Sequence, residues 1–371
     1  MKKITGQFPI STSYDFNKIA PASKICFLDI ETTGLSSGNS FLYLIGLVRI
    51  CDDSFETLQL FAESHEDEPL LLTELSDYLK DYTHIIHFNG NTFDIPYLKA
   101  KYEQHGIPSP FNDLSGIDLY KRIRSFKKLL KLPDLKQKTI EALLDTGRVD
   151  EYSGGELIKV YENYLLNPNE EDLSLLLLHN REDILGLTRI SIFMELTDII
   201  ETPQAVRKVV LNTYEDYYGV AKKELLITLK LSSDFPSDLS CREGDFYMNI
   251  EGDLLHISVP VLEDELKYFY ANYKDYYYLP EEDAAFHKSV ASFVDPEHRV
   301  KCTKANCYTK RKSLFVPEFA PVVQPIFKKN YEDTIQYFEL TDEIKKNRDA
   351  FSLYASNILS YIAYKTSSDK E

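Results

Sequence analysis

The chain has no tryptophan and only three methionines and five cysteines among its 371 residues. An odd number of cysteines without a secretory segment excludes a full disulfide framework and indicates reduced thiols in a cytoplasm. The N-terminal sequence MKKITGQFPISTSYDF contains no apolar segment long enough for export. No stretch approaches the roughly 20 apolar residues of a membrane span, so the sequence predicts no membrane partner.

Basic residues are also scarce. Lysine and arginine together number 42 against 59 aspartate and glutamate residues, which gives a formal net charge of −17. A uniformly acidic surface repels nucleic acid, so binding to it would depend on local basic patches and bound metal. The hydrophobic content of 43% is ample for a core, and the length predicts two domains.

Apolar runs and their periods predict the elements of the first half of the chain. The segments expected as strands are 25–30, 41–50, 55–62, 84–88 and 116–119. Those with a helical period are 68–81, 93–106 and, with breaks at proline and glycine, 119–200. Hairpin-like strands followed by alternating helices and strands predict an α/β fold with a mixed sheet flanked by helices.

The pattern changes after Pro203, where short alternating runs begin, and residues 342–366 end the chain with a helical period. We therefore predict three parts: an N-terminal leader at 1–22, an α/β domain at 23–203 and a C-terminal α+β domain at 204–371. The sequence assigns no role to the last of these.

Asp29 and Glu31 end the apolar run ICFLDIE. Residues two apart on a strand point to the same face, and burying two carboxylates together is costly unless a cation neutralises them. Oxygen ligands of this type suit magnesium or manganese. Taken alone, the pair could equally be a turn with an exposed cap.

Two further segments present acids. Asp94 lies at the start of a predicted helix, where an aspartate can also serve only as a cap. His179 and Asp183 are four residues apart and share one helix face. Taken alone, His179 could simply pack the helix. Glu182 faces another direction on the helix and is left out.

These segments resemble known motifs. FLDIETTGL resembles the first exonuclease motif of the DEDD group of ribonuclease-H-like 3′–5′ exonucleases, which are DnaQ-like. FNGNTFDIPYL resembles the second motif, in the form found in family-B DNA polymerases, and HNREDILGL resembles the third. The closest resemblance is to the YprB-type ribonuclease-H-like family, from about Lys24 to about Ile200. The chain combines the four-residue spacing of the tyrosine-type subgroup with the histidine of the other subgroup.

The resemblance implies a site for two divalent ions, Mg²⁺ or Mn²⁺. Asp29 would bridge ions about 3.5–4 Å apart. Glu31 and Asp183 would complete the shell of one ion, and Asp94 would hold the other. His179 would take the proton of the attacking water.

The resemblance also implies contacts with a nucleic acid, either single-stranded or at a 3′ end. The stretch that binds the terminal nucleotide in relatives matches Thr32, Thr33, Gly34 and Leu35. Asn89 and Phe93, within the second motif, are further candidates for substrate binding.

The segment KRIRSFKKLLK could track a phosphate backbone if it forms a helix with Ile123, Phe126 and Leu130 packed inward. Its candidate contacts are Arg122, Arg124, Lys127 and Lys128; a solvated helix face is the alternative. A second basic segment, 299–312, could also guide a strand. Cys302 and Cys307 within it fit no standard zinc spacing, and free thiols are the favoured interpretation.

The sequence therefore predicts a metal-dependent 3′–5′ exonuclease acting on DNA or RNA. Two alternatives stay open. One is a non-catalytic nucleic-acid-binding or adaptor protein on an exonuclease-derived fold, and the other is an oligonucleotide phosphodiesterase. The presence of all four acids favours the enzyme. The sequence does not choose between DNA and RNA, and it names no protein partner.

Overall fold

A computed structural model of the chain describes residues 1–127, 130–144, 147–150, 152–236 and 238–368. The chain divides into two compact units. The N-terminal unit comprises Met1–Thr197 with Ser232–Ser237, and the C-terminal unit comprises Asp198–Leu231 with Asp238–Glu371. Among the described residues, no helix is long and apolar enough to cross a bilayer.

The N-terminal unit and the helix that leads out of it contain strands and helices in alternation. They are β1 (Lys2–Pro9), β2 (Ile25–Thr32), β3 (Leu42–Cys51), β4 (Ser54–Phe61), α1 (Glu68–Leu79), β5 (His84–His87), α2 (Asp94–Gln104), β6 (Ser115–Asp118), α3 (Leu119–Arg124), α4 (Gln137–Ala142), α5 (Gly154–Leu166), α6 (Glu170–Ile190) and α7 (Met194–Glu201).

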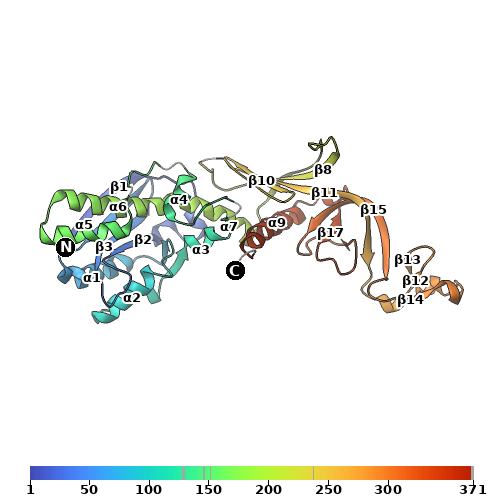
Figure 1. The fold of residues 1–371 in the computed structure, drawn as a ribbon, viewed down its shortest axis with the longest axis horizontal. Coiled ribbons are helices and arrows are strands. Elements are labelled where there is room, and N and C mark those ends of the chain that lie inside the picture. Colours follow the sequence, from blue (N-terminus) through green and yellow to red (C-terminus); the bar gives the residue numbers. More distant parts are fainter. Residues whose placement is uncertain (128–129, 145–146, 151, 237, 369–371) are drawn as a thin grey trace. The chain divides into compact units, whose positions relative to one another are not determined.

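One mixed sheet in the order β1-β4-β3-β2-β5-β6 forms the centre of this unit. The strands from β1 to β2 pair antiparallel, whereas β2, β5 and β6 pair parallel. Helix α6 lies along β2 and β3 with α5 and α4 beside it, and α1 and α2 lie on the other side of the sheet (Figure 1). The predicted α/β fold with a mixed sheet flanked by helices is confirmed.

Strand β2 lies in the middle of the sheet because its apolar residues are buried on both faces. Phe27 and Leu28, which point to opposite faces, are 0% and 1% exposed. The polar end of β2 therefore projects from a rigid, fully packed strand. This placement fixes the acids at that end relative to the helices that cover the sheet.

Residues 2–9 differ from the polar leader that we predicted. They form the edge strand β1, which pairs with β4 along its whole length, from Lys2 opposite Phe61 to Pro9 opposite Ser54. Exposure alternates along β1, with Ile4 and Phe8 on the half-buried side. This weak alternation of apolar and polar residues becomes a strand because β4 offers it an unpaired edge.

The C-terminal unit is built mainly from antiparallel strands and closes with a long helix. Its elements are β7 (Val206–Glu215), β8 (Ala221–Lys230), β9 (Leu239–Glu243), β10 (Phe246–Glu251), β11 (Leu254–Phe269), β12 (Tyr276–Leu279), β13 (Ala284–His287), α8 (Lys288–Ala291), β14 (Val300–Lys301), β15 (Tyr308–Glu318), β16 (Ile326–Phe327), β17 (Gln336–Glu339) and α9 (Arg348–Ser368).

These strands form an eight-stranded sheet and a separate three-stranded sheet, β13-β12-β14. Helix α9 packs against β7 and β15 of the larger sheet (Figure 1). Buried Phe351 and Tyr354 of α9 lie against Phe338 of β17, with ring centroids 6.3 and 5.2 Å apart. The additional C-terminal domain that we predicted is thus present as a packed α+β structure.

Candidate metal centre

Strand β2 presents Asp29 and Glu31 on one face at its carboxyl end. Asp29 lies opposite Gly46 and Glu31 opposite Leu44 in the antiparallel ladder. A Cβ at Gly46 would lie 2.3 Å from Oδ1 of Asn180, so only glycine lets α6 approach the sheet here. As a result, Asn180 donates a 3.0 Å hydrogen bond from Nδ2 to Asp29 Oδ2.

Helix α6 brings His179 and Asp183 to the same place. The His179 Nε2 atom lies 3.3 Å from Asp183 Oδ2 and 3.5 Å from Glu31 Oε1. One ligand atom from each of these three residues lies within 4.8 Å of the others, a grouping that could hold a metal ion. His179 and Asp183, which are four residues apart on α6, therefore lie beside the end of β2.

Asp94 is the first residue of α2 and is 7% exposed. Strand β5, which precedes α2, runs parallel to β2, so α2 begins beside the end of β2. Burial raises the pKa of Asp94 to about 7, although its own backbone N–H and that of Ile30 oppose the rise. The Asp94 charge in turn raises the pKa of both Asp29 and Glu31, so the four predicted acids share one electrostatic field.

The acids at this site repel one another. Burial is the largest cause that raises the pKa of Asp29 and Glu31 well above the ordinary value, and the charge of Asp183 is the second. Carboxylate oxygens are the donors that magnesium and manganese prefer. A bound divalent cation would remove the repulsion. The residues present therefore fit divalent ions.

Arg148 and Asp150 lie beside the acids, and no sequence motif pointed to them. Arg148 Nη2 is 2.6 Å from Asp183 Oδ1 and 3.0 Å from Asp150 Oδ2, and Nη1 is 3.1 Å from Glu141 Oε1. His179 Nδ1 lies 2.7 Å from Asp150 Oδ2. The signal available in the sequence was the pair Arg148-x-Asp150 inside the stretch that resembles the YprB-type family.

Asp150 is ionised although it is buried. Burial opposes ionisation, but hydrogen bonds from Arg148 and Lys138 outweigh it and hold the pKa of Asp150 at about 2. Glu182, which faces away from the acids, accepts hydrogen bonds from the backbone N–H groups of Val149 and Asp150. Helix α6 thus holds the segment 148–150 through Glu182 and also carries His179.

The predicted nucleotide-binding stretch forms a tight loop after β2. Thr32 Oγ1 donates to the carbonyl of Gly34, and the N–H of Phe41 donates to Thr33 Oγ1. Leu35 is 87% exposed. Its apolar side chain is therefore open to solvent, four residues after Glu31 along the chain.

Asn89 and Phe93 have local structural roles. Asn89 adopts a left-handed conformation with a φ of 57°, and its N–H donates to Asp118 Oδ1. The Phe93 ring is partly buried and packs 5.4 Å from the ring of Tyr97. Neither residue has a described contact with the four acids.

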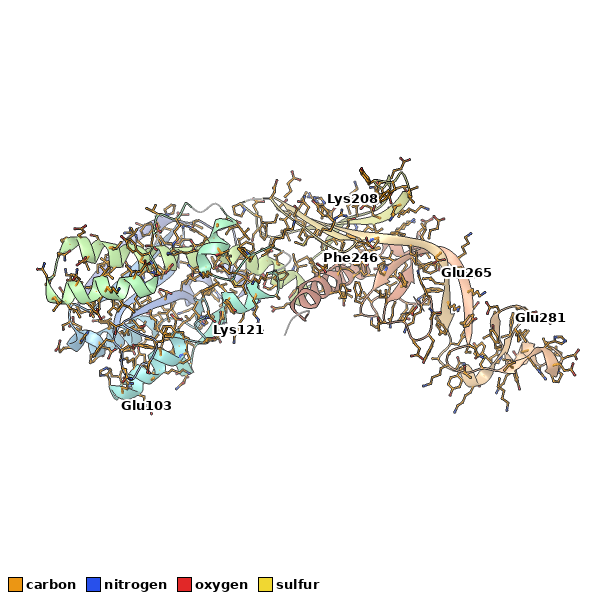
Figure 2. The ribbon with its side chains drawn as sticks, viewed as in Figure 1. Glu103, Lys121, Lys208, Phe246, Glu265 and Glu281 are labelled. Atoms are coloured by element: carbon orange, nitrogen blue, oxygen red, sulfur yellow. The ribbon has the colours of Figure 1, made fainter. Side chains whose placement is uncertain are left out.

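The basic segment after β6 is only partly helical, because α3 ends at Arg124. Ile123, Phe126 and Leu130 are buried, as we predicted. Arg122 Nη1 donates to Thr197 Oγ1. Lys121 and Arg124 are exposed and Lys127 is half-buried, and no ion pair of theirs occurs within the described residues; Lys128 lies outside them. Figure 2 labels Lys121, which lies within α3.

The second basic segment, 299–312, is neutralised in part by acids of its own unit. Lys310 pairs with Asp283 and lies 3.7 Å from Glu265, and Arg311 lies 2.7 Å from Glu339. Cys302 and Cys307 are buried free thiols. In the described part of the chain, neither cysteine belongs to a grouping that could hold a metal ion.

Comparison with known proteins places the fold. Residues 26–194 match the family model of the RNase H superfamily. No curated protein matches the chain. Among solved structures, the chain is similar to the family B DNA polymerase from the hyperthermophilic archaeon Pyrobaculum calidifontis, with 17% identity and a TM-score of 0.38.

The similarity covers 49% of this chain and 26% of the polymerase chain, so about half of this chain spans about a quarter of the polymerase. The RNase H superfamily match lies over the mixed sheet and over the segments that carry the acids. Residues 26–194 thus have a ribonuclease-H-like fold. The superfamily match supports a nuclease-type function that involves nucleic acid and divalent metal.

Proposed function

We propose that the protein is a two-metal-dependent 3′–5′ exonuclease that hydrolyses phosphodiester bonds of single-stranded DNA or RNA. The observation that carries the proposal is that Glu31 of β2 and Asp183 of α6 lie together with His179, and that the charges of Asp183 and Asp94 act on both Asp29 and Glu31. Only Asp183 among them has a cationic partner other than histidine within the described residues. A partly buried acid cluster with so little compensation is costly for the fold, and bound metal would explain it.

The chain's own residues have distinct roles in this proposal. Asp29, Glu31, Asp94 and Asp183 would hold two ions, Mg²⁺ or Mn²⁺. Such ions supply charge neutralisation at the phosphate and a nucleophile at neutral pH. His179, whose Nε2 faces Glu31 and Asp183, would accept a proton from the attacking water.

Substrate contacts complete the proposal. The loop Thr32–Leu35 would hold the terminal nucleotide, with the exposed Leu35 against its base. Asn89 and Phe93 would line the approach, and the exposed Lys121 and Arg124 would follow the phosphate backbone with Arg122 and Lys127. Membership of the YprB-type group is part of the proposal and is supported by His179-x-x-x-Asp183. A cytoplasmic location is supported by the five free cysteines.

A degradation assay tests the proposal. The full chain is incubated with 5′-labelled single-stranded DNA, single-stranded RNA and dinucleotides, in Mn²⁺ and in chelator. We expect the strand to shorten stepwise from its 3′ end. A 3′-phosphate should block this shortening, and a chelator should abolish it. Cleavage of dinucleotides alone would indicate an oligonucleotide phosphodiesterase instead. Binding without cleavage of any substrate would indicate a non-catalytic protein.

A further inference from the structure

Asp150 is a buried carboxylate whose hydrogen bonds come from several directions. Its side chain is 0% exposed. Oδ2 lies 2.7 Å from His179 Nδ1 and 3.0 Å from both Arg148 Nη2 and Lys138 Nζ, and Oδ1 accepts from the N–H of Tyr152 at 3.1 Å. With these partners the carboxylate cannot turn without breaking several contacts.

The contact with His179 decides which ring nitrogen carries hydrogen. A carboxylate flanked by two cations is an acceptor only, so His179 Nδ1 must donate to it. In a neutral imidazole the other nitrogen, Nε2, then has a free lone pair. That atom is the one 3.3 Å from Asp183 Oδ2 and 3.5 Å from Glu31 Oε1.

The segment that carries Asp150 is anchored to the helix that carries His179. Glu182 of α6 accepts from the N–H of Asp150 at 2.8 Å. Arg148 connects Asp150 to Asp183 of the same helix through a single nitrogen, Nη2. The position of the carboxylate relative to the imidazole is therefore set on α6 itself.

We propose that Asp150 is a positioning residue that holds the His179 ring with Nδ1 protonated and Nε2 directed at the acid cluster. This inference rests on the proposed function, in which Nε2 accepts the proton of the attacking water. A carboxylate behind an imidazole has this orienting role both in hydrolytic triads and behind metal-bound histidines.

The alternative is that Asp150 only neutralises Arg148 and Lys138. Glu141 provides a matched control, because it is 1% exposed and its Oε1 lies 3.1 Å from Arg148 Nη1, yet it has no described contact with His179. Both Asp150→Asn and Glu141→Gln remove one buried charge from the arginine. Only the first changes the partner of the imidazole.

The kinetic test compares these two variants in Mg²⁺. Asp150→Asn should lower kcat on the order of 10²-fold to 10⁴-fold, the range for a mispositioned proton acceptor, while KM stays within about twofold. Glu141→Gln should lower kcat by less than about tenfold, because it leaves the imidazole contact in place. Equal losses in both variants would overturn the proposal.

A spectroscopic test needs no activity. The ring ¹⁵N shifts of His179 in the Mg²⁺-loaded full chain at pH 8, assigned by the signal that His179→Asn removes, should report hydrogen on Nδ1. In Asp150→Asn they should report hydrogen on Nε2. A wild-type ring with hydrogen on Nε2 overturns the proposal even if the variant does not fold. If wild type cleaves no nucleic acid but its ring has hydrogen on Nδ1, the proposed function fails and the positioning stands.

Discussion

The buried Glu68 and the partly buried acid cluster, both in the N-terminal unit, differ in how their charge is compensated. Glu68 at the start of α1 is 3% exposed and fully partnered. Its Oε1 accepts from the N–H of Leu42 at 2.7 Å and lies 2.9 Å from Lys101 Nζ, and its Oε2 lies 2.8 Å from His105 Nε2. Within the described residues, the acid cluster of Asp29, Glu31, Asp94 and Asp183 has one cation other than histidine in an ion pair, Arg148.

The difference separates a structural acid from the acids that we propose as metal ligands. Around Glu68, each buried charge has a partner, so the group joins α1, α2 and β3 without need of a ligand. In the acid cluster, mutual repulsion raises the pKa of Asp29 and Glu31 beyond the effect of burial alone. Proteins tolerate such local conflict mainly where function requires it.

The largest effect should come from removing one acid of the cluster. Asp29→Asn should lower the rate of hydrolysis by at least about 10³-fold, or about 4 kcal/mol, because metal ions supply several kcal/mol of charge stabilisation. Asp183→Asn should lower the rate of hydrolysis by a similar factor. Without metal, the free energy of unfolding of Asp29→Asn should equal or exceed that of wild type, since a repelling charge is gone. Hydrolysis is measured on a labelled single strand and unfolding in denaturant with chelator.

Activity retained by Asp29→Asn and still sensitive to chelator would contradict the assignment of this residue. A loss of stability in the metal-free variant would also break the comparison, because Asp29 would then resemble Glu68. The hydrogen bond from Asn180 is preserved when asparagine presents its oxygen to Nδ2, so the variant is conservative in shape.

The sequence was sufficient to group Asp29 with Glu31 and His179 with Asp183 because their local periods are strict, whereas Asp94 was reached through the second motif. Alternation on a strand placed Asp29 and Glu31 on one face, and i, i+4 spacing placed His179 with Asp183. Arg148 and Asp150 could not be predicted in the same way, since their contacts arise only when the segment 148–150 folds onto α6. A short polar stretch with two opposite charges reads as exposed.

The same limit applied to the basic segments and to β1. The cations of 299–312 looked unpaired in the sequence, but two of them have acidic partners in the structure. Lys310 pairs with Asp283 and Arg311 with Glu339, and these contacts depend on how the strands pair. Strand β1 exists because an edge of β4 is available, which no local pattern reveals.

The second-largest effect concerns Glu68, the acid whose charge is fully compensated. Glu68→Gln should lower the free energy of unfolding by about 3–5 kcal/mol, because Lys101, which is 3% exposed, keeps its charge without a carboxylate. Denaturant unfolding measures this. Glu74→Gln on the same helix is the control. The pair of Glu74 with Lys3 is partly exposed to solvent and should contribute at most about 1 kcal/mol. Similar losses in both variants would show that the burial of Glu68 is unimportant.

A smaller effect should follow from adding metal. Ions that bind only the folded state stabilise it by about 2.7 kcal/mol when their free concentration is about a hundred times Kd. Thermal unfolding in millimolar Mn²⁺ should shift upward for wild type and for Glu74→Gln but not for Asp29→Asn. An equal shift in Asp29→Asn would place the metal elsewhere and leave the acid cluster without its explanation.

The smallest effect concerns pH and isolates Asp94. Burial raises its pKa from 3.8 to about 7, so the folded carboxyl gains a proton between pH 8 and 6 while the unfolded one stays ionised. The folded state then binds more protons, and metal-free stability should rise by about 1.4 kcal/mol as pH falls through this window. Asp94→Asn should lack this increment. The measurement is the difference in free energy of unfolding between wild type and Asp94→Asn, determined in chelator at each pH. Parallel curves would mean that Asp94 is compensated as Glu68 is. In saturating Mg²⁺ the increment should shrink, because metal and proton compete for the same oxygens.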